Sequence, residues 1–380
     1  MMAGFYEAVR RIDCPPIVDW KARGKRVVGY TCSYVPGEIF HAAGILPVRL
    51  RGIGTTSTRI GDAYFGPYIC SFPKCILQLA GEGRFDFLDG TVITPGCDSM
   101  RRLDECWRKA GDDHPGIVPC FFYYFDVPHK TEPHGTAWFE EEIRNLIRAV
   151  ETHFNVCITP EKLQASIVLF NKGRDLLAHM EALRSAQPGA ISGADAFAVA
   201  VASTVMPRED YTRQLAEYLE TATARRNESA SDGQKRLMVL GSISDDMALI
   251  ELIEADGQAV VAAENLCFGV RHDGHPIQEN SDPVAALARG YLGASTCPRM
   301  FGQYKARLAS VLAAIERAAI DGVVLQNIRF CDLHGSENSL FERDLEAKGI
   351  PCLKIEREYG PLVETGRIGM RLEAFLERLG

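Results

Sequence analysis

Short apolar runs alternate with helix-like segments in two parts of this sequence, and this alternation limits the fold more than any other feature. Near the N-terminus, the apolar run at residues 26–32 leads through a turn into a helical segment at 39–43, which stops at Gly44, and then into a second apolar run at 46–50. The same order recurs at residues 68–125 and again after residue 236. Repeated strand, helix and strand units favour parallel sheets covered by helices, so the sequence predicts an α/β fold.

The two alternating parts are separated by a block of helical patterns. Apolar residues recur at helical spacing through residues 140–154, 161–183, 193–204 and 208–226, and the polar run 227–233 has the composition of a linker. A chain of 380 residues with 46% hydrophobic residues can bury more than one core. We therefore predict an α/β domain at residues 1–155, a helical segment at 156–232 and a second α/β domain at 233–380, with the crevice between the α/β domains as the expected ligand site.

Three cysteines stand where an apolar run gives way to a helical pattern. Cys70 precedes a helical segment, Cys97 follows a Pro-Gly turn ahead of a helix that opens at Asp98 or Ser99, and Cys331 ends the run 323–330. A thiol near a helix N-terminus is expected to have a lowered pKa, and the thiolate form binds metals or attacks electrophiles. Ligands of open α/β sheets bind at the carboxyl ends of the strands. We therefore expect the three thiols to converge on one site in the crevice.

The spacing of the cysteines alone leaves their role open. None of the 12 cysteines forms a Cys-x-x-Cys pair, and the separations match no zinc or ferredoxin motif. The alternative is that they are small buried hydrophobic residues, as free cysteines commonly are. Cys267 and Cys297 also end apolar runs and are second-rank ligand candidates. The cysteines that lie inside apolar patterns or beside turns are interpreted as structural: Cys14, Cys106, Cys120, Cys157 and Cys352.

Polar residues near the predicted strand ends supply further candidates. Ser33 and Glu38 follow the first predicted strand and could transfer protons near the crevice, or they could be a helix cap and a solvated carboxylate. His334, three residues after Cys331, could donate a hydrogen bond to a cluster or substrate, or cap the next helix. The turn at 241–246 has the position of a phosphate-binding turn but lacks the second and third glycines of a dinucleotide fingerprint.

Charge and hydropathy exclude several classes of partner. The chain has 42 basic and 50 acidic residues, and no run of Lys or Arg exceeds two. This balance argues against nucleic acid or an anionic membrane as the main partner. The apolar runs are too short for a membrane span, and the N-terminal stretch carries charges where a secretory signal would be apolar. The sequence thus predicts a cytoplasmic protein whose cysteines are thiols or metal ligands rather than disulfides.

Several of these segments, taken together, resemble the 2-hydroxyacyl-CoA dehydratase and benzoyl-CoA reductase family. The matching segments occur in the family's order over nearly the whole chain: residues 29–38 (GYTCSYVPGE), 42–50 (AAGILPVRL), 87–90 (FLDG), 96–101 (GCDSMR), 330–334 (FCDLH), 349–356 (GIPCLKIE) and the tail 367–379. The resemblance implies a catalytic subunit with two Rossmann-like domains and a helical part.

The resemblance also implies a cofactor and partners. Motif by motif, the ligands of a 4Fe-4S cluster with one open iron fall on Cys70, Cys97 and Cys331, while Cys32 lies in a motif whose cysteine varies among members. The open iron would act as a Lewis acid on an acyl-CoA thioester and pass it one electron, for dehydration of a 2-hydroxyacyl-CoA or for reduction of an aromatic ring. A separate ATP-dependent iron–sulfur activator would supply the electron, in agreement with the absence of a P-loop motif here. The subunit would pair with a homologous subunit or with itself.

Three alternatives remain open at this point. Some family members carry a larger double-cubane cluster and reduce small molecules, but they are richer in cysteine around the interval 70–97, where this chain adds only Cys75. A second alternative is a cluster-free binding or scaffold subunit. A third is a zinc hydrolase.

Overall fold

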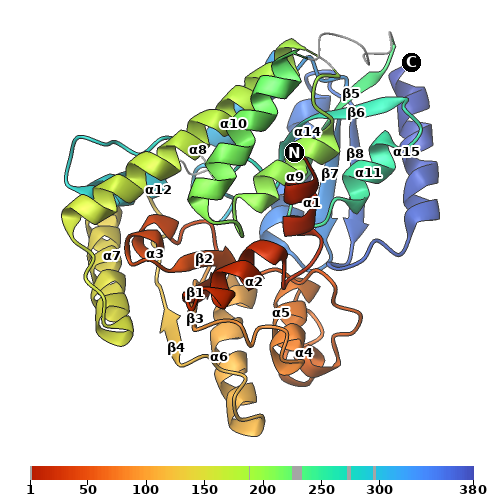
Figure 1. The fold of residues 1–380 in the computed structure, drawn as a ribbon. Helices are drawn as coiled ribbons and strands as arrows, with labels where there is room; N and C mark the ends of the chain where they lie inside the picture. Colours follow the sequence, from red (N-terminus) through yellow and green to blue (C-terminus); the bar gives the residue numbers. More distant parts are fainter. Residues whose placement is uncertain (1, 188, 225–232, 272–274, 294–296) are drawn as a thin grey trace.

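The computed structural model describes residues 2–187, 189–224, 233–271, 275–293 and 297–380. It contains two four-stranded parallel sheets with a helical segment between them in the chain, which confirms the predicted α/β class (Figure 1). The predicted linker at 227–233 lies, apart from Gly233, outside the described residues. Within the described residues, no helix combines the length and the apolar character needed to cross a membrane.

The first sheet is formed by the N-terminal part of the chain. Its strands, in the order β2-β1-β3-β4, are β1 (Val27–Tyr30), β2 (Leu46–Arg49), β3 (Gly90–Ile93) and β4 (Phe121–Tyr124). The helices that connect them are α3 (Gly37–Ala42), α4 (Arg59–Tyr64), α5 (Ser71–Gly81) and α6 (Asp98–Asp113). The order places the topological switch point between β1 and β3, where ligands of doubly wound sheets bind.

The helical segment follows β4. It consists of α7 (Pro133–Phe154), α8 (Pro160–Ala186), α9 (Gly193–Ala202) and α10 (Arg208–Ala224). The side chains of Thr159 and Ser192 accept hydrogen bonds from the first turns of α8 and α9, so ordinary N-caps set where these helices begin. Asn155 ends α7 in a left-handed conformation with φ of 52°.

The second sheet repeats the topology of the first. Its strands, in the order β6-β5-β7-β8, are β5 (Lys235–Gly241), β6 (Ala259–Asn265), β7 (Gly322–Ile328) and β8 (Cys352–Arg357). Its helices are α11 (Ala248–Glu254), α12 (Pro283–Gly293), α13 (Tyr304–Arg317), α14 (Asp332–Glu346) and α15 (Thr365–Leu379). The switch point of this sheet lies between β5 and β7.

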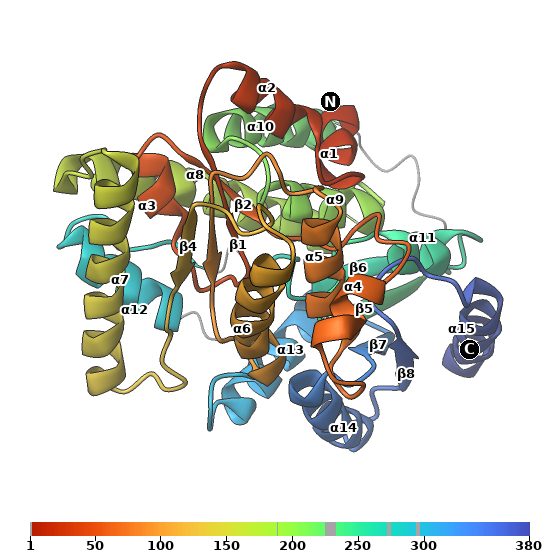
Figure 2. The ribbon, with the colours of Figure 1, turned by 90° about the horizontal axis from the view of Figure 1, so that it is seen from below.

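Helices cover both faces of each sheet, which explains why the strands are apolar throughout. In β5, Met238 and Leu240 pack against α13 and α14, whereas Leu237 and Val239 face a core that also includes α5, α6 and α9. That core is continuous between the two sheets. Figures 1 and 2 show the helices α7 and α15 at opposite ends of the molecule.

Three local predictions differ from the structure. Residues 68–70 form no strand, because β1 and β3 pair directly with each other and leave no place between them. The helix predicted from residue 339 begins at Asp332, directly after Cys331. Helix α12 was not predicted at all. It packs on α7, so its apolar face is covered by a segment far away in the sequence.

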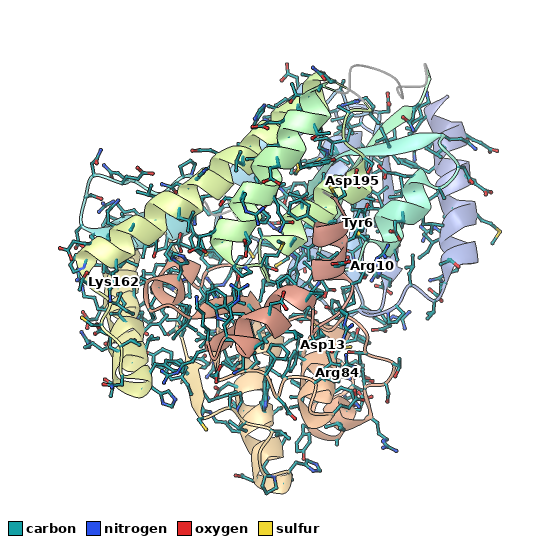
Figure 3. All side chains as sticks on the ribbon, viewed as in Figure 1. Tyr6, Arg10, Asp13, Arg84, Lys162 and Asp195 are labelled. Atoms are coloured by element: carbon teal, nitrogen blue, oxygen red, sulfur yellow. The ribbon has the colours of Figure 1, made fainter. Side chains whose placement is uncertain are left out.

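The N-terminal helices are α1 (Met2–Val9), which lies on the helical segment, and α2 (Pro15–Ala22). Helix α1 packs on α9, and the Tyr6 hydroxyl donates a hydrogen bond of 2.8 Å to Asp195 (Figure 3). The buried Arg51 guanidinium donates to the backbone carbonyls of Ala8, Val9 and Arg11 at the end of α1. The three sequence-based domain boundaries remain a prediction.

Candidate functional site

The predicted cysteines lie at the carboxyl ends of the strands. Cys97 follows β3 and Cys331 follows β7, and each of these strands borders the switch point of its own sheet. Cys70 follows no strand, but it precedes α5, which connects β2 to β3. The site is therefore built on the loops where an open α/β sheet ordinarily binds ligands.

All three cysteines are N-cap residues. Cys70 caps α5, Cys97 caps α6 and Cys331 caps α14. Backbone N–H groups in the first turns of these helices face the sulfurs and act to lower the thiol pKa: Phe72 on Cys70, Ser99 and Met100 on Cys97, and His334 on Cys331. The local sequence thus places each sulfur at the positive end of a helix.

The thiols also lie within electrostatic range of one another. Burial, and then the neighbouring Cys97, raise the pKa of Cys70 to about 12. Burial likewise raises the pKa of Cys331, with added contributions from Cys70 and Cys97. The structure thus brings together one cysteine from the second sheet and two from the first.

The expectation of lowered thiol pKa values is wrong for this site. The pKa of Cys97 is raised as well, because its burial outweighs the helix N-terminus. These three thiols, of which Cys70 is buried and Cys97 and Cys331 are half-buried, are stable as neutral groups, and a bound cation would have to replace their protons.

The side chains that could donate to a metal show whether this site fits an iron–sulfur cluster. No group of three or more His, Cys, Asp or Glu side chains in the described ranges is arranged to hold a single metal ion. A cluster imposes a different requirement, because each cysteine binds a different iron and the sulfurs lie farther apart. Three free thiols within electrostatic range of one another, each at a helix N-terminus, fit a cluster better than one zinc ion.

A second group of thiols lies beside the first, and it contains the second-rank candidates Cys267 and Cys297 together with Cys32, which had been left out. Cys32 after β1, Cys267 after β6, and Cys297 interact electrostatically with one another. Cys297 also acts on Cys97, and Cys267 acts on Cys331. With Cys75, which interacts electrostatically with Cys70, seven thiols of the described residues therefore occupy one continuous region.

Buried arginines accompany this second group. Arg49 of β2 donates from Nη2 to the Cys267 sulfur at 2.9 Å and from Nη1 to the Cys267 carbonyl at 2.6 Å. Burial alone would raise the pKa of Cys267, but Arg49 and Arg271 hold it below its ordinary value. Arg299 donates to the carbonyls of Val127 and Pro128 and so fixes the loop after β4. An arginine within an apolar strand, as in LPVRL at 46–50, is the sequence signal that could have indicated this site.

The predicted proton-transfer residues occupy different surroundings. Ser33 is half-buried in the loop after β1, beside Cys32. Glu38 is fully buried in α3, where it accepts hydrogen bonds of 2.7 Å from Arg174 and from the Tyr291 hydroxyl. Neither of these contacts is with a cysteine. The role of Glu38 in proton transfer stays a prediction.

His334 lies close to the candidate cluster ligand Cys331. It is buried in the first turn of α14 and lines a cavity of about 290 Å³ together with Arg271, Arg307 and Glu337. Burial, and then the two arginines, hold its pKa well below the ordinary value, so the imidazole is neutral at pH 7. A neutral imidazole can donate or accept a hydrogen bond without adding charge.

A groove opens the site to solvent beside Cys97. It has a volume of about 750 Å³ and is lined on one side by the Cys97 loop and Arg101, and on the other by Tyr124, His129 and Trp138. Trp138 is half exposed. The groove gives a molecule of moderate size access to Cys97.

The turn at 241–246 is not an open phosphate cradle. A Cβ atom at Gly241, which has φ of 151°, would lie 1.8 Å from the Gln326 carbonyl oxygen. The Ser242 hydroxyl accepts the Ile328 N–H at 2.7 Å. The glycine is required by close packing of β5 on β7, not by a ligand.

Comparison with known proteins gives consistent matches. The family model described as 2-hydroxyglutaryl-CoA dehydratase, D-component, matches residues 32–379. One of the subunits of benzoyl-CoA reductase from Thauera aromatica is 30% identical over 321 residues, which cover 82% of this chain and 81% of that protein. The beta subunit of (R)-phenyllactyl-CoA dehydratase of Clostridium sporogenes is 24% identical, with 88% and 87% covered. The beta subunit of (R)-2-hydroxyglutaryl-CoA dehydratase of Acidaminococcus fermentans is 22% identical, and the match covers both chains completely.

Proposed function

The chain belongs to the 2-hydroxyglutaryl-CoA dehydratase D-component family, and on that premise we propose that it is an iron–sulfur subunit acting on an acyl-CoA thioester. The reaction is dehydration of a 2-hydroxyacyl-CoA or reduction of an aromatic acyl-CoA ring. The observation that carries the proposal is the electrostatic proximity of Cys70, Cys97 and Cys331, each of which caps a helix N-terminus.

In this proposal, Cys70, Cys97 and Cys331 would hold a 4Fe-4S cluster as thiolates. When bound, such a cluster supplies a Lewis-acidic iron open to the substrate and one low-potential electron. The helix N-termini stabilise the thiolate form of the ligands. Arg49 and Arg299 balance part of the negative charge from the buried sulfurs.

Other residues of the chain prepare the site for a reactive substrate. The neutral His334 can donate a hydrogen bond to a cysteine sulfur or to the thioester, and Ser33 offers a hydroxyl on the opposite loop. The groove beside Cys97 admits the substrate, and the buried surroundings of the thiols limit access of water.

The partners follow from the same premise. Three relatives bear names that describe them as one subunit of a larger enzyme. We propose that this chain pairs with a homologous subunit or with a second copy of itself in the cytoplasm. A separate ATP-dependent iron–sulfur activator supplies the electron.

The test is anaerobic purification of the wild type and of Cys97→Ser, followed by quantification of iron and sulfide and by visible absorption spectroscopy. The wild type should contain iron and sulfide with the broad absorption of a cluster, and Cys97→Ser should lose both. The matched control is Cys106→Ser, which changes a buried thiol in the same helix α6 and should keep its iron. Full iron content in Cys97→Ser would contradict the assignment, and a wild type without iron would favour a cluster-free scaffold subunit.

A second candidate is a larger, double-cubane cluster in a reductase of small molecules. The specific observation in its favour is the second thiol group, Cys32, Cys267 and Cys297, next to the first. A variant with Cys267→Ser distinguishes the two: it should keep four irons per chain if only the first group binds a cluster, and it should lose iron if both groups do.

A further inference from the structure

A network of buried hydrogen bonds joins the two halves of the molecule next to Cys70. Tyr359 follows β8, and its hydroxyl accepts the Gly52 N–H at 2.8 Å and donates to Asp245 Oδ1 at 2.6 Å. Gly52 belongs to the loop after β2 and Asp245 to the loop after β5. Since Tyr359 is only 4% exposed and Asp245 2%, one phenol links loops of both sheets away from water.

The same segment holds the N-terminus of α5. The Ser71 hydroxyl accepts the Tyr359 N–H at 2.8 Å and donates to Glu358 Oε2 at 2.7 Å. The Phe72 ring packs edge-on against the Tyr359 ring, with their centroids 4.9 Å apart. Ser71 and Phe72 are the first two residues of α5, directly after Cys70, so these contacts fix the backbone that carries the Cys70 thiol.

A short path of backbone hydrogen bonds continues from Tyr359 to Cys331. Arg357, two residues before Tyr359, pairs with Ile328 at the end of β7. The Arg329 N–H then donates to the Arg357 carbonyl, and the Cys331 N–H to the Ile328 carbonyl, both at 2.9 Å. The sequence neighbours of Cys70 are thereby tied to the loop that carries Cys331.

The packing around Tyr359 leaves no free space. A Cβ atom at Gly52 would lie 2.4 Å from the Tyr359 ring and 2.8 Å from the Cys75 Cβ. Asp245 Oδ2 is buried and has no hydrogen-bond partner within the described part of the chain. A fold keeps such a costly buried carboxyl where another requirement outweighs the cost.

We propose that Tyr359 is a positioning residue that fixes the Cys70 thiol relative to Cys331. This inference rests on the proposed function, in which both thiols are ligands of one cluster. In this role Tyr359 acts through Ser71 and through the loops that it joins.

The experiment measures the alkylation rate of individual thiols in the metal-free protein, by iodoacetamide labelling and mass spectrometry. Cys70 and Cys352 are both 7% exposed, so the alkylation of either thiol requires local opening, and Cys352 lies at the far end of β8 as an internal reference. Tyr359→Phe removes the hydroxyl shared by Gly52 and Asp245. It should raise the Cys70 rate about tenfold, which corresponds to about 1.4 kcal/mol for the two buried hydrogen bonds that the hydroxyl makes. The Cys352 rate should not change.

The matched control is Tyr304→Phe, which removes a 2.9 Å tyrosine–aspartate hydrogen bond to Asp344 between α13 and α14. It should leave the Cys70 rate unchanged. Equal acceleration of Cys70 and Cys352 in Tyr359→Phe would indicate general destabilisation and overturn the proposal, as would unchanged rates for both. Should Tyr359→Phe fail to fold, Ser71→Ala tests the same link, and it supports the proposal only if Cys70 alone reacts faster.

Iron-loaded protein separates this inference from the proposed function. Iron content of the wild type decides whether a cluster binds, and a protein without iron fails the proposed function whatever the alkylation rates are. If iron binds, Tyr359→Phe should keep the iron but change the electron paramagnetic resonance spectrum, whereas Tyr304→Phe should not. An unchanged spectrum in Tyr359→Phe would refute the positioning role.

Discussion

Replacing Glu38 with alanine should lower the free energy of unfolding by about 3–5 kcal/mol. The carboxylate is fully buried, and its two oxygens accept hydrogen bonds of 2.7 Å from Arg174 and from Tyr291. Arg174 is 5% exposed, so the substitution leaves a guanidinium inside the protein without its carboxylate. The cost comes mainly from the loss of the carboxylate that balances this buried charge, although Arg174 keeps its hydrogen bonds to Asn171 and Tyr291.

The expected change can be measured by thermal unfolding. With an entropy of unfolding of roughly 2.1 cal/mol/K per residue, 380 residues give about 0.8 kcal/mol/K, so a loss of about 4 kcal/mol lowers the midpoint by about 5 °C. The control is Asp210→Ala, which breaks an exposed ion pair of 3.0 Å with Arg213 and should leave the midpoint nearly unchanged, because solvent screens the pair.

A double variant tests the explanation itself. If the uncompensated charge is the cause, Glu38→Ala combined with Arg174→Ala should cost clearly less than the sum of the two single changes. A loss below about 1 kcal/mol for Glu38→Ala, or strict additivity in the double variant, would refute the reasoning.

Two further predictions concern packing and pH. Gly241→Ala should destabilise the chain by more than about 3 kcal/mol in denaturant unfolding, because the new Cβ would overlap the Gln326 carbonyl oxygen at a φ of 151°. The control is Gly366→Ala, which has open space around it and should change stability by less than about 1 kcal/mol. The hydrogen bond from His41 lowers the pKa of Glu209 from 4.5 to about 2, so this carboxylate stabilises the fold above pH 4.5 and less as the pH falls toward 2. Glu209→Gln should therefore lower the free energy of unfolding by only about 0.5 kcal/mol at pH 6, since the side chain is largely exposed. The difference in stability from the wild type should shrink on acidification. A difference that stays constant with pH would contradict a stabilising role of the Glu209 carboxylate.

The sequence was sufficient for the parts of the fold that depend on local patterns. Apolar runs such as 236–241 and 322–330 predicted strands of the second sheet because both faces of a parallel sheet are buried. The position of Cys97 after a strand and a Pro-Gly turn predicted its place at a helix N-terminus. The supposed strand before Cys70 was wrong because a short apolar run does not reveal whether a neighbouring strand is available.

Features that depend on distant contacts could not be predicted in this way. The helix N-termini led us to expect low thiol pKa values, but burial, which depends on the whole fold, outweighs that effect. Cys32, Cys267 and Cys297 lie close together although they come from loops of both sheets. No local sequence pattern predicts this proximity. The burial of Glu38 could not be foreseen either, because its partners, Arg174 and Tyr291, come from α8 and α12.

The contacts of helix α1 bear on how the chain can be shortened or tagged. Arg51, whose guanidinium is held by the last carbonyls of α1, directly precedes Gly52, which in turn donates to the Tyr359 hydroxyl. Removing the first dozen residues would leave a buried cation without its acceptors one residue away from the contact that supports Cys70. An affinity tag is therefore better attached after α15, whose last turn is mostly exposed, than by replacing the N-terminal helix.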